Sequence, residues 1–185
     1  GRHGLKMIAA DPGVQVAFED GSVLPWWHDQ QRTHDELARY SLNDAKAFFK
    51  LDDELKVLAK YLQPFFLEPP PNTEAKGIAG LLEVLRVGNR LRGLNGKKIS
   101  ELIAFLTGSL EQLLDRYFQS EQVKRLILAN NLYGKHGGPR DAGSAMGLLF
   151  HLLSGGEEAK QGFTGHVIGG MGAITQAMAK ACIEV

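Results

Sequence analysis

The sequence is poor in the features that would cross-link, anchor or strongly charge a protein. Cys182 is its single cysteine, so no disulfide can form within the chain and a disulfide-rich secreted scaffold is excluded. No apolar run approaches the roughly 18 residues of a membrane-spanning helix, and the first residues lack the apolar stretch of a signal peptide. The formal net charge is +0, from 21 basic and 21 acidic residues, which argues against a nucleic-acid partner. Together these absences favour a cytoplasmic globular protein.

Motifs of common catalytic and metal sites are missing as well. The histidines are scattered, form no H-x-x-x-H pair and have no cysteine pair beside them, so we expect no metal site. The chain has no Walker loop, no G-x-S-x-G and no Cys/His nucleophile pair, so no catalytic residue can be named. His166 is the histidine nearest to a glycine-rich turn and is a candidate site residue. A partly buried, hydrogen-bonded histidine is the alternative interpretation.

Two charged clusters fit ordinary surface structure. Asp52, Asp53 and Glu54 stand among lysines on one expected helix, which indicates a solvated, salt-bridged face rather than paired catalytic carboxylates. A basic run without acids is typical of a helix end and the loop after it. Its members are Arg86, Arg90, Arg92, Lys97 and Lys98. Attraction to a membrane surface is the second interpretation of this run.

Alternating apolar residues near the beginning of the chain predict a small antiparallel sheet. Residues 14–18 (VQVAF) and 23–27 (VLPWW) flank an Asp-Gly turn signal, which favours a β-hairpin. Pro25 cannot donate to a strand ladder, so its strand is expected at a sheet edge. Residues 5–10 (LKMIAA) are a candidate third strand beside the hairpin.

From residue 30 onward the apolar spacing changes to the helical period of 3.6. Ser41 with Asp44, and Ser109 with Gln112, resemble capping boxes that begin helices. Pro64 is expected to break the helix that begins after Ser41. Further helices are predicted over 31–40, from a cap at Asn72 or Thr73 to the GLNG of 93–96, over 99–106, after Ser120, over 144–153 and from Gly172. The chain is therefore predicted to be one α+β domain, residues 1–185, with a small β part followed by a helical bulk.

Two glycine-rich segments stand out, GGPRDAGSA (137–145) and HVIGGMGAITQAMAKAC (166–182). The second matches the dinucleotide-binding pattern G-x-G-x-x-G only as far as its second glycine, and no room remains for the acid that binds a ribose. A tight turn with glycines that allow close packing is the plainer interpretation.

Both segments resemble those of phytoene-desaturase-like flavoproteins, a group that includes the pyridine nucleotide-disulfide oxidoreductase domain-containing proteins. The opening RHGLKMIAADPGVQVAFEDGS resembles the stretch in which such chains enter their substrate domain. The order and spacing of the three segments agree, so the resemblance spans nearly the whole chain. Ala142, where the family often has proline, and Ile168, where a polar or basic residue is common, depart from the pattern.

The resemblance implies a substrate domain that is inserted into a larger FAD-dependent oxidoreductase. An FAD-binding part of the same parent chain would be its partner, and an apolar small molecule would lose a hydride to the flavin. Gly169, Gly170, Met171 and Gly172 would lie near the flavin. Residues of the substrate cavity would be Gly138, Pro139, Arg140, Asp141 and His166. The 185-residue chain alone is expected to be inactive.

The same residues, and the chain as a whole, also have interpretations that need no flavin. Asp141 can be a helix N-cap and Arg140 a surface or packing residue. The chain as a whole can be a non-catalytic helical interaction domain, through amphipathic helices such as 97–107 and 109–119. It can also be a peripheral membrane module that attaches through the helices around 78–106.

Overall fold

The computed structural model describes residues 3–72, 74, 76–131, 137–154 and 164–184. The strands are β1 (Met7–Ala10), β2 (Val14–Ala17), β3 (Val23–Trp26) and β4 (Thr164–Val167). The helices are α1 (Gln30–Ala38), α2 (Leu42–Leu67), α3 (Gly77–Leu91), α4 (Gly96–Thr107), α5 (Leu110–Tyr117), α6 (Glu121–Asn131), the short 3₁₀ helix η1 (Ser144–Met146), α7 (Gly147–Ser154) and α8 (Gly172–Ile183). The predicted α+β class, predominantly helical, is confirmed.

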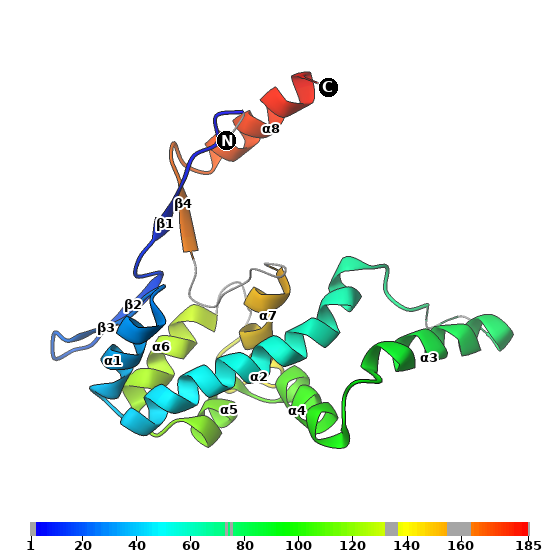
Figure 1. Ribbon diagram of the computed structural model, residues 1–185, viewed down its shortest axis with the longest axis horizontal. Coiled ribbons are helices and arrows are strands. Elements are labelled where there is room, and N and C mark those ends of the chain that lie inside the picture. Colours follow the sequence, from blue (N-terminus) through cyan, green and yellow to red (C-terminus); the bar gives the residue numbers. More distant parts are fainter. Residues whose placement is uncertain (1–2, 73, 75, 132–136, 155–163, 185) are drawn as a thin grey trace.

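Figure 1 shows three parts of the molecule. A helical body gathers α1, α2 and α4 to α7 with the β2–β3 hairpin at one end. An arm made of β1, β4 and α8 rises from this body. Helix α3 stands apart beyond the far end of α2, to the right in the figure. The body alone has a buried core, because the arm and α3 contain no fully buried residue among those described.

The predicted hairpin is confirmed, whereas the predicted three-stranded sheet is wrong. Strands β2 and β3 pair in antiparallel register, with Gln15 opposite Pro25. Strand β1 pairs instead with β4, with Met7 opposite Val167. The prediction failed because it joined strands that are neighbours in sequence, whereas the partner of β1 comes from the other end of the chain.

The core of the body forms where α2 meets the helices that follow it. Helix α7 packs along α2, and α6 covers the hairpin. Trp26 of the hairpin meets Phe48 of α2 edge-on, with ring centroids 4.7 Å apart. Leucines at helical spacing supply most of the apolar burial that stabilises the body. The largest fully buried side chains include Leu24, Leu37, Leu55, Leu58, Leu110, Leu114, Leu126, Ile127, Leu148 and Leu149.

Helices of the body begin at the residues that the sequence signals predict, and one of these residues also makes a contact that the sequence did not predict. The Ser41 hydroxyl accepts a hydrogen bond from the Asp44 N–H, which caps α2. The buried Asp44 carboxylate is not the return half of a capping box. It accepts hydrogen bonds from the backbone N–H groups of Gln119, at 3.0 Å, and Ser120, at 2.7 Å. One carboxylate therefore joins the beginning of α2 to the beginning of α6.

The predicted end of α2 at Pro64 is wrong. The helix continues through the proline to Leu67. The proline removes one backbone hydrogen bond from the helix, and the burial of the preceding turns in the core stabilises the helix by more than this loss.

The predicted beginning of α3 is wrong as well. The Asn72 side chain accepts from the Glu74 N–H and forms a local turn instead of a helix cap. Helix α3 begins after Lys76 with no side-chain cap. Thr73, the other candidate cap, lies outside the described residues.

Candidate functional site

The Gly-Gly-Met-Gly segment forms the turn between β4 and α8. Gly169 and Gly170 both have positive φ, +88° and +75°, a backbone conformation that is costly for residues with a Cβ. The Gly170 N–H donates to the Val167 carbonyl at 3.0 Å, and the Ala173 N–H donates to the Gly170 carbonyl at 3.1 Å. Two consecutive glycines are therefore needed for the chain to reverse sharply from strand into helix.

Few of the described residues lie against this turn. A Cβ built on Gly170 or Gly172 would meet no atom of the described residues within 4 Å, and the Met171 side chain is 75% exposed. At Gly169 the nearest atom would be the Cβ of Ala173, at 3.5 Å. The plainer interpretation is therefore confirmed for the tight turn, whereas the close packing that it also expected is not seen among the described residues. The glycines leave the backbone open to an approaching group.

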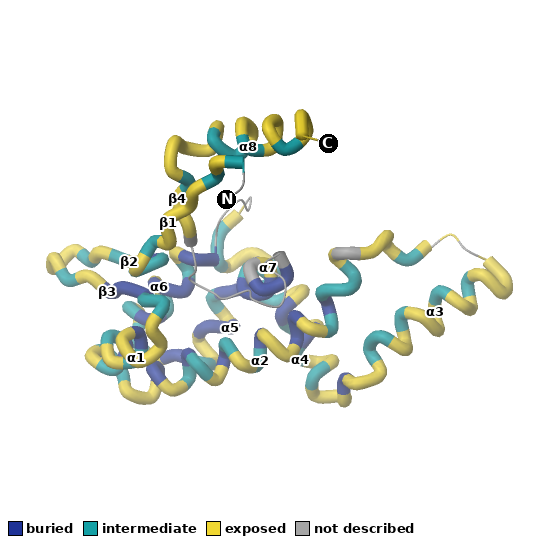
Figure 2. Tube along the Cα trace, turned by 45° about the horizontal axis from the view of Figure 1, so that its top comes forward, coloured by how far each residue is buried: buried dark blue, intermediate teal, exposed yellow. Residues whose placement is uncertain are grey.

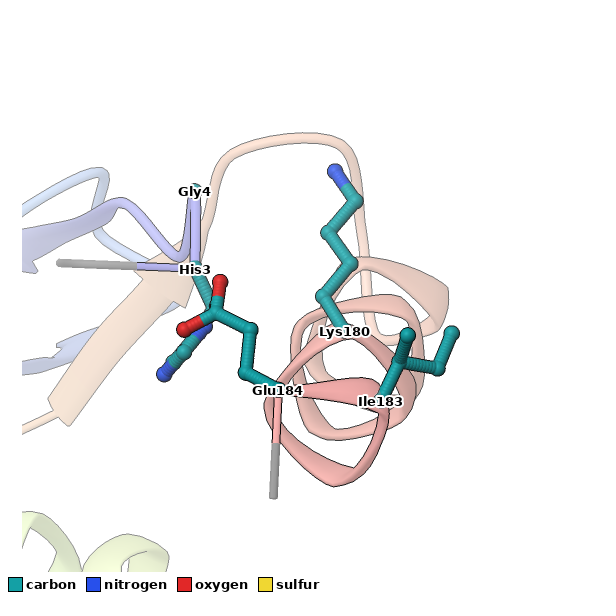
Figure 3. A pocket seen from close by; sticks show the side chains of 5 residues that line it. All are labelled: His3, Gly4, Lys180, Ile183 and Glu184. Atoms are coloured by element: carbon teal, nitrogen blue, oxygen red, sulfur yellow. The ribbon is translucent and has the colours of Figure 1, made fainter.

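The end of helix α8 lies beside the first described residues of the chain. Near this end, His3 Nδ1 lies 3.4 Å from Glu184 Oε1. No sequence signal pointed to this contact, because its two sides come from opposite ends of the chain. A hollow of about 390 Å³ lies here. Figure 3 shows the residues that line it, which are His3, Gly4, Lys180, Ile183 and Glu184.

In the second glycine-rich segment, residues 137–145, the Asp141 carboxylate closes a turn. Gly137 has a φ of +114°, and the Gly138 N–H donates to Asp141 Oδ2 at 2.7 Å. Asp141 is therefore not a helix N-cap, since Gly143 takes that position before η1. The proposed N-cap failed because the Gly138 N–H, three residues earlier, is the donor that the carboxylate reaches.

Arg140 is a surface residue, which agrees with the plainer interpretation of its role. Its side chain is 80% exposed. Its Nε donates to Glu111 Oε2 at 2.7 Å, which joins the segment to the first turn of α5.

The same segment clamps the corner between α4 and α5. The Pro139 carbonyl accepts from the Glu111 N–H at 3.0 Å, and the buried Ser144 hydroxyl accepts from the Leu110 N–H at 2.8 Å. These bonds satisfy N–H groups that the beginning of α5 would leave unpaired. The segment thus has a structural role in the body. A role of Gly138, Pro139, Arg140 and Asp141 at a substrate cavity stays a prediction.

The structure does not bring the two glycine-rich segments together within the part of the chain that it describes. Figure 1 shows β4 and α8 in the arm above the body, whereas α4 and α5 lie on the opposite side of the body. His166 lies in β4, opposite Ile8, and is exposed rather than partly buried. The Ile168 N–H donates to the Lys6 carbonyl at 3.0 Å, which extends the β1–β4 pairing up to the turn. His166 therefore belongs with the turn and not with the α4–α5 corner.

The acidic cluster on α2 is the salt-bridged face that the sequence predicts. Lys56 Nζ lies 2.6 Å from Asp52 Oδ2 and 3.7 Å from Asp53 Oδ1. Glu54 accepts a hydrogen bond of 2.6 Å from the Tyr117 hydroxyl, which ties α2 to α5. Burial, and then this hydrogen bond to Glu54, raise the pKa of the Tyr117 phenol. Among the residues that the structure describes, no group of three histidine, cysteine or acidic side chains could hold a metal ion.

The basic run extends from the second half of α3 through its C-terminal end to the beginning of α4, as the helix-end interpretation predicts, and two of its members pair with an acid. Arg86 and Arg90 both pair with Glu68, just after the end of α2, and the Arg86 contact measures 2.9 Å. The hydrogen bond from Arg90 is the largest of the causes that lower the pKa of the Glu68 carboxyl. The sequence missed this pairing because Glu68 lies across a loop from the two arginines. In the described part of the chain, no helix has both the length and the apolar character to cross a bilayer.

Comparison with known proteins gives relatives that are named as oxidoreductase-domain proteins. The chain is 29% identical over 193 residues to the pyridine nucleotide-disulfide oxidoreductase domain-containing protein 2 of Mus musculus, and 97% of the chain is covered. The protein of the same name from Rattus norvegicus is 28% identical over the same share. The chain spans about a third, 33%, of the length of both curated relatives. No family model matches the chain, and no solved structure matches it significantly.

These similarities confirm the coarser part of the resemblance. Nearly the whole chain is similar to one part of a longer oxidoreductase-domain protein. The likeness to phytoene desaturases stays a prediction from the glycine-rich segments.

Proposed function

We propose that this chain is the substrate-binding part of an FAD-dependent oxidoreductase that acts on an apolar small molecule. The observation that carries the proposal is the similarity of nearly the whole chain to one third of an oxidoreductase-domain protein. The exposed turn between β4 and α8 supports it. In this proposal the turn lies against the flavin once an FAD-binding part of the same parent chain is in place.

The residues of the turn fit a flat ring. Gly170 and Gly172 carry no side chain, and a Cβ on either would point into open space. Helix α8 begins at Gly172 without a side-chain cap, and although the Ala173 and Ile174 N–H groups bond to backbone carbonyls of the turn, the positive end of the helix dipole favours an electron-rich or anionic group here. Met171, exposed and flexible, would provide an apolar wall beside the ring.

The arm also has the surface that a docking partner would cover. Several exposed apolar side chains on one projecting part are typical of an interface. We infer that the FAD-binding part packs against this arm, and that the body projects from the docked arm toward the substrate. The exposed apolar side chains of the arm include Met7, Ile8, Ile168, Met171, Met178 and Ile183.

Bound flavin would supply the two-electron acceptor, and the chain would supply binding, orientation and the exclusion of water. The glycines let the backbone approach the ring closely, and Met171 keeps the adjacent space apolar. His166 and the segment from Gly138 to Asp141 are proposed to border the substrate. In the chain alone these two groups lie apart, so a complete cavity would need the FAD-binding part.

The test is to express the complete reading frame that contains this chain, purify the product and record its visible spectrum before and after denaturation. Stoichiometric FAD, absent from the purified 185-residue chain, would support the proposal. Absence of flavin from the complete product would overturn it, and a helical interaction domain would become the better assignment. Turnover of a substrate by the 185-residue chain alone would contradict the need for an FAD-binding partner.

A matched pair of glycine variants locates the flavin. Gly170 and Gly21 have similar φ values, +75° and +80°, and a Cβ meets nothing within 4 Å at either. Gly170→Ala and Gly21→Ala should therefore cost similar folding free energy, about 1–2 kcal/mol each. In the complete protein, Gly170→Ala should lower the FAD content that survives gel filtration, whereas Gly21→Ala should leave it unchanged. Equal effects of the two variants would remove the turn from the site.

A further inference from the structure

We propose that α3 is an interfacial helix that lies flat on an anionic lipid bilayer with its leucine face in the membrane. Helix α3 projects beyond the body, and Figure 2 shows it almost entirely exposed or half-exposed. It has no buried residue, although it is one of the longer helices of the chain. The inference rests on exposure and charge and does not depend on the proposed function.

The apolar residues of α3 form one continuous face. Ile78, Leu81, Leu82 and Leu85 follow the spacing i, i+3, i+4, i+7, which places them in a stripe along one side of a helix. Their exposed fractions are 80%, 59%, 61% and 58%. Helices with such a stripe normally bury it against a core. Here the described residues leave the stripe in contact with solvent.

The charges around this stripe select the kind of surface that would cover it. The segment from 68 to 98 holds six basic and three acidic residues, although the chain as a whole has a net charge of +0. Ion pairs offset part of this charge: Glu68 pairs with Arg86 and Arg90, Glu83 also pairs with Arg86, and Lys97 lies 3.7 Å from Glu101. Counted as far as Glu101, the segment still has six basic and four acidic residues. An apolar stripe flanked by basic side chains matches the acyl boundary and anionic headgroups of a bilayer. The basic residues are Lys76, Arg86, Arg90, Arg92, Lys97 and Lys98.

The length of α3 agrees with a helix that lies on a membrane. Its 15 residues extend about 22 Å, at roughly 1.5 Å per residue, which is shorter than the ~30 Å hydrocarbon core. Basic residues stand at both ends of the helix, at Lys76 and at Arg90 and Arg92. Their long side chains can reach headgroups while the apolar face sinks below them.

The test is co-sedimentation of the 185-residue chain with vesicles of phosphatidylcholine alone and of phosphatidylcholine with phosphatidylserine. We expect binding to the anionic vesicles and at least about tenfold weaker binding to the neutral ones, since each basic residue near an anionic surface contributes. Raising the salt from about 0.1 M to about 0.5 M should weaken binding severalfold, because the Debye length shortens.

Two double variants and a control separate the apolar face from the charges. Leu82→Ser with Leu85→Ser removes two exposed side chains of the stripe and should reduce binding about tenfold or more. Val87→Ser is the control, because Val87 lies on the same helix but at none of the i+3, i+4 or i+7 spacings from the residues of the stripe. Arg92→Gln with Lys97→Gln should weaken binding to anionic vesicles and leave weak binding to neutral vesicles unchanged. Circular dichroism verifies that each variant is folded.

Three outcomes would overturn the proposal. The first is no binding to either kind of vesicle. The second is binding that Leu82→Ser with Leu85→Ser leaves unchanged. The third is self-association in sedimentation velocity that the same double variant abolishes, without vesicle binding, which would assign the stripe to a second copy of the chain. Loss of flavin from the complete protein would not affect any of these results, so the two proposals fail separately.

Discussion

Helices α3 and α5 have the same kind of apolar pattern and opposite surroundings. In α5, Leu110 and Leu114 are buried in the body. In α3, Leu81, Leu82 and Leu85 are more than half exposed. Amphipathic spacing therefore shows that a helix has a face to cover, and it does not show what covers it. The apolar face of α5 packs against the rest of the body. The described residues do not bury the apolar face of α3, so whatever covers that face lies outside them.

The sharpest way to test this comparison is to truncate one leucine in each helix. Leu114→Ala removes a side chain that is 1% exposed and should lower the free energy of unfolding by about 2–5 kcal/mol, because it leaves a cavity. Leu82→Ala, at 61% exposure, should change it by less than about 0.5 kcal/mol. Urea unfolding followed by circular dichroism measures both. Equal losses would show that α3 packs into a core in solution.

The second test compares how helices are held at their beginnings. Asp44 accepts from two backbone N–H groups at the start of α6, whereas α3 begins without a side-chain cap. Asp44→Ala should cost about 2–3 kcal/mol, since it leaves two donors unpaired where the carboxylate was buried. Asp53→Ala is the control, because that side chain is 80% exposed and should matter little. A small effect of Asp44→Ala in thermal unfolding would mean that water replaces the carboxylate.

The third test uses pH on the contact between α5 and α2. Burial raises the pKa of Tyr117 above the unfolded value of about 10, so its contribution is complete below pH ~10 and is lost as the pH rises toward the folded pKa. The urea midpoint of the natural chain should therefore fall more steeply above pH ~10 than that of Tyr117→Phe. At neutral pH, Tyr117→Phe should cost about 0.5–1.5 kcal/mol. Parallel curves for the two proteins would contradict a half-buried phenol that is hydrogen-bonded to Glu54.

The smallest expected effect concerns the contact that holds α3 near the end of α2. Glu68→Gln removes the charge that pairs with Arg86 and Arg90, and it should leave the unfolding midpoint unchanged because the pair is exposed. It should nevertheless speed trypsin cleavage after these arginines, since local opening of α3 becomes easier. Glu74→Gln is the control. Unchanged cleavage in Glu68→Gln would show that the ion pairs do not restrain α3.

Local signals in the sequence predicted much of the fold. Ser41 and Ser109 cap the helices that they were expected to cap, and the hairpin forms around its Asp-Gly turn. These features depend on residues that are close in sequence, where backbone geometry decides. The failure at Pro64 has the opposite cause, since burial of the surrounding helix in the core outweighs a local preference.

Long-range features could not be predicted in this way. Nothing in residues 5–10 identifies 164–167 as the partner of β1, and Glu68 gives no sign of its two arginines. The candidate site shows the same division. The glycines at 169 and 170 were found because a local glycine-rich pattern marks a turn, and both have positive φ in the structure. Their separation from the Gly138–Asp141 corner depends on the packing of the whole chain.

The pairing of β1 with β4 has a consequence for how this molecule can be changed. The chain leaves the arm after Ala10 and returns to it at Thr164, so two adjacent strands form the covalent entrance and exit of the helical body. A different helical body could be inserted between β1 and β4 while the residue pairs between these two strands stay unchanged. The junction of β1 and β4 with the body is thus a point at which another helical body can be inserted without changing the surface of the arm.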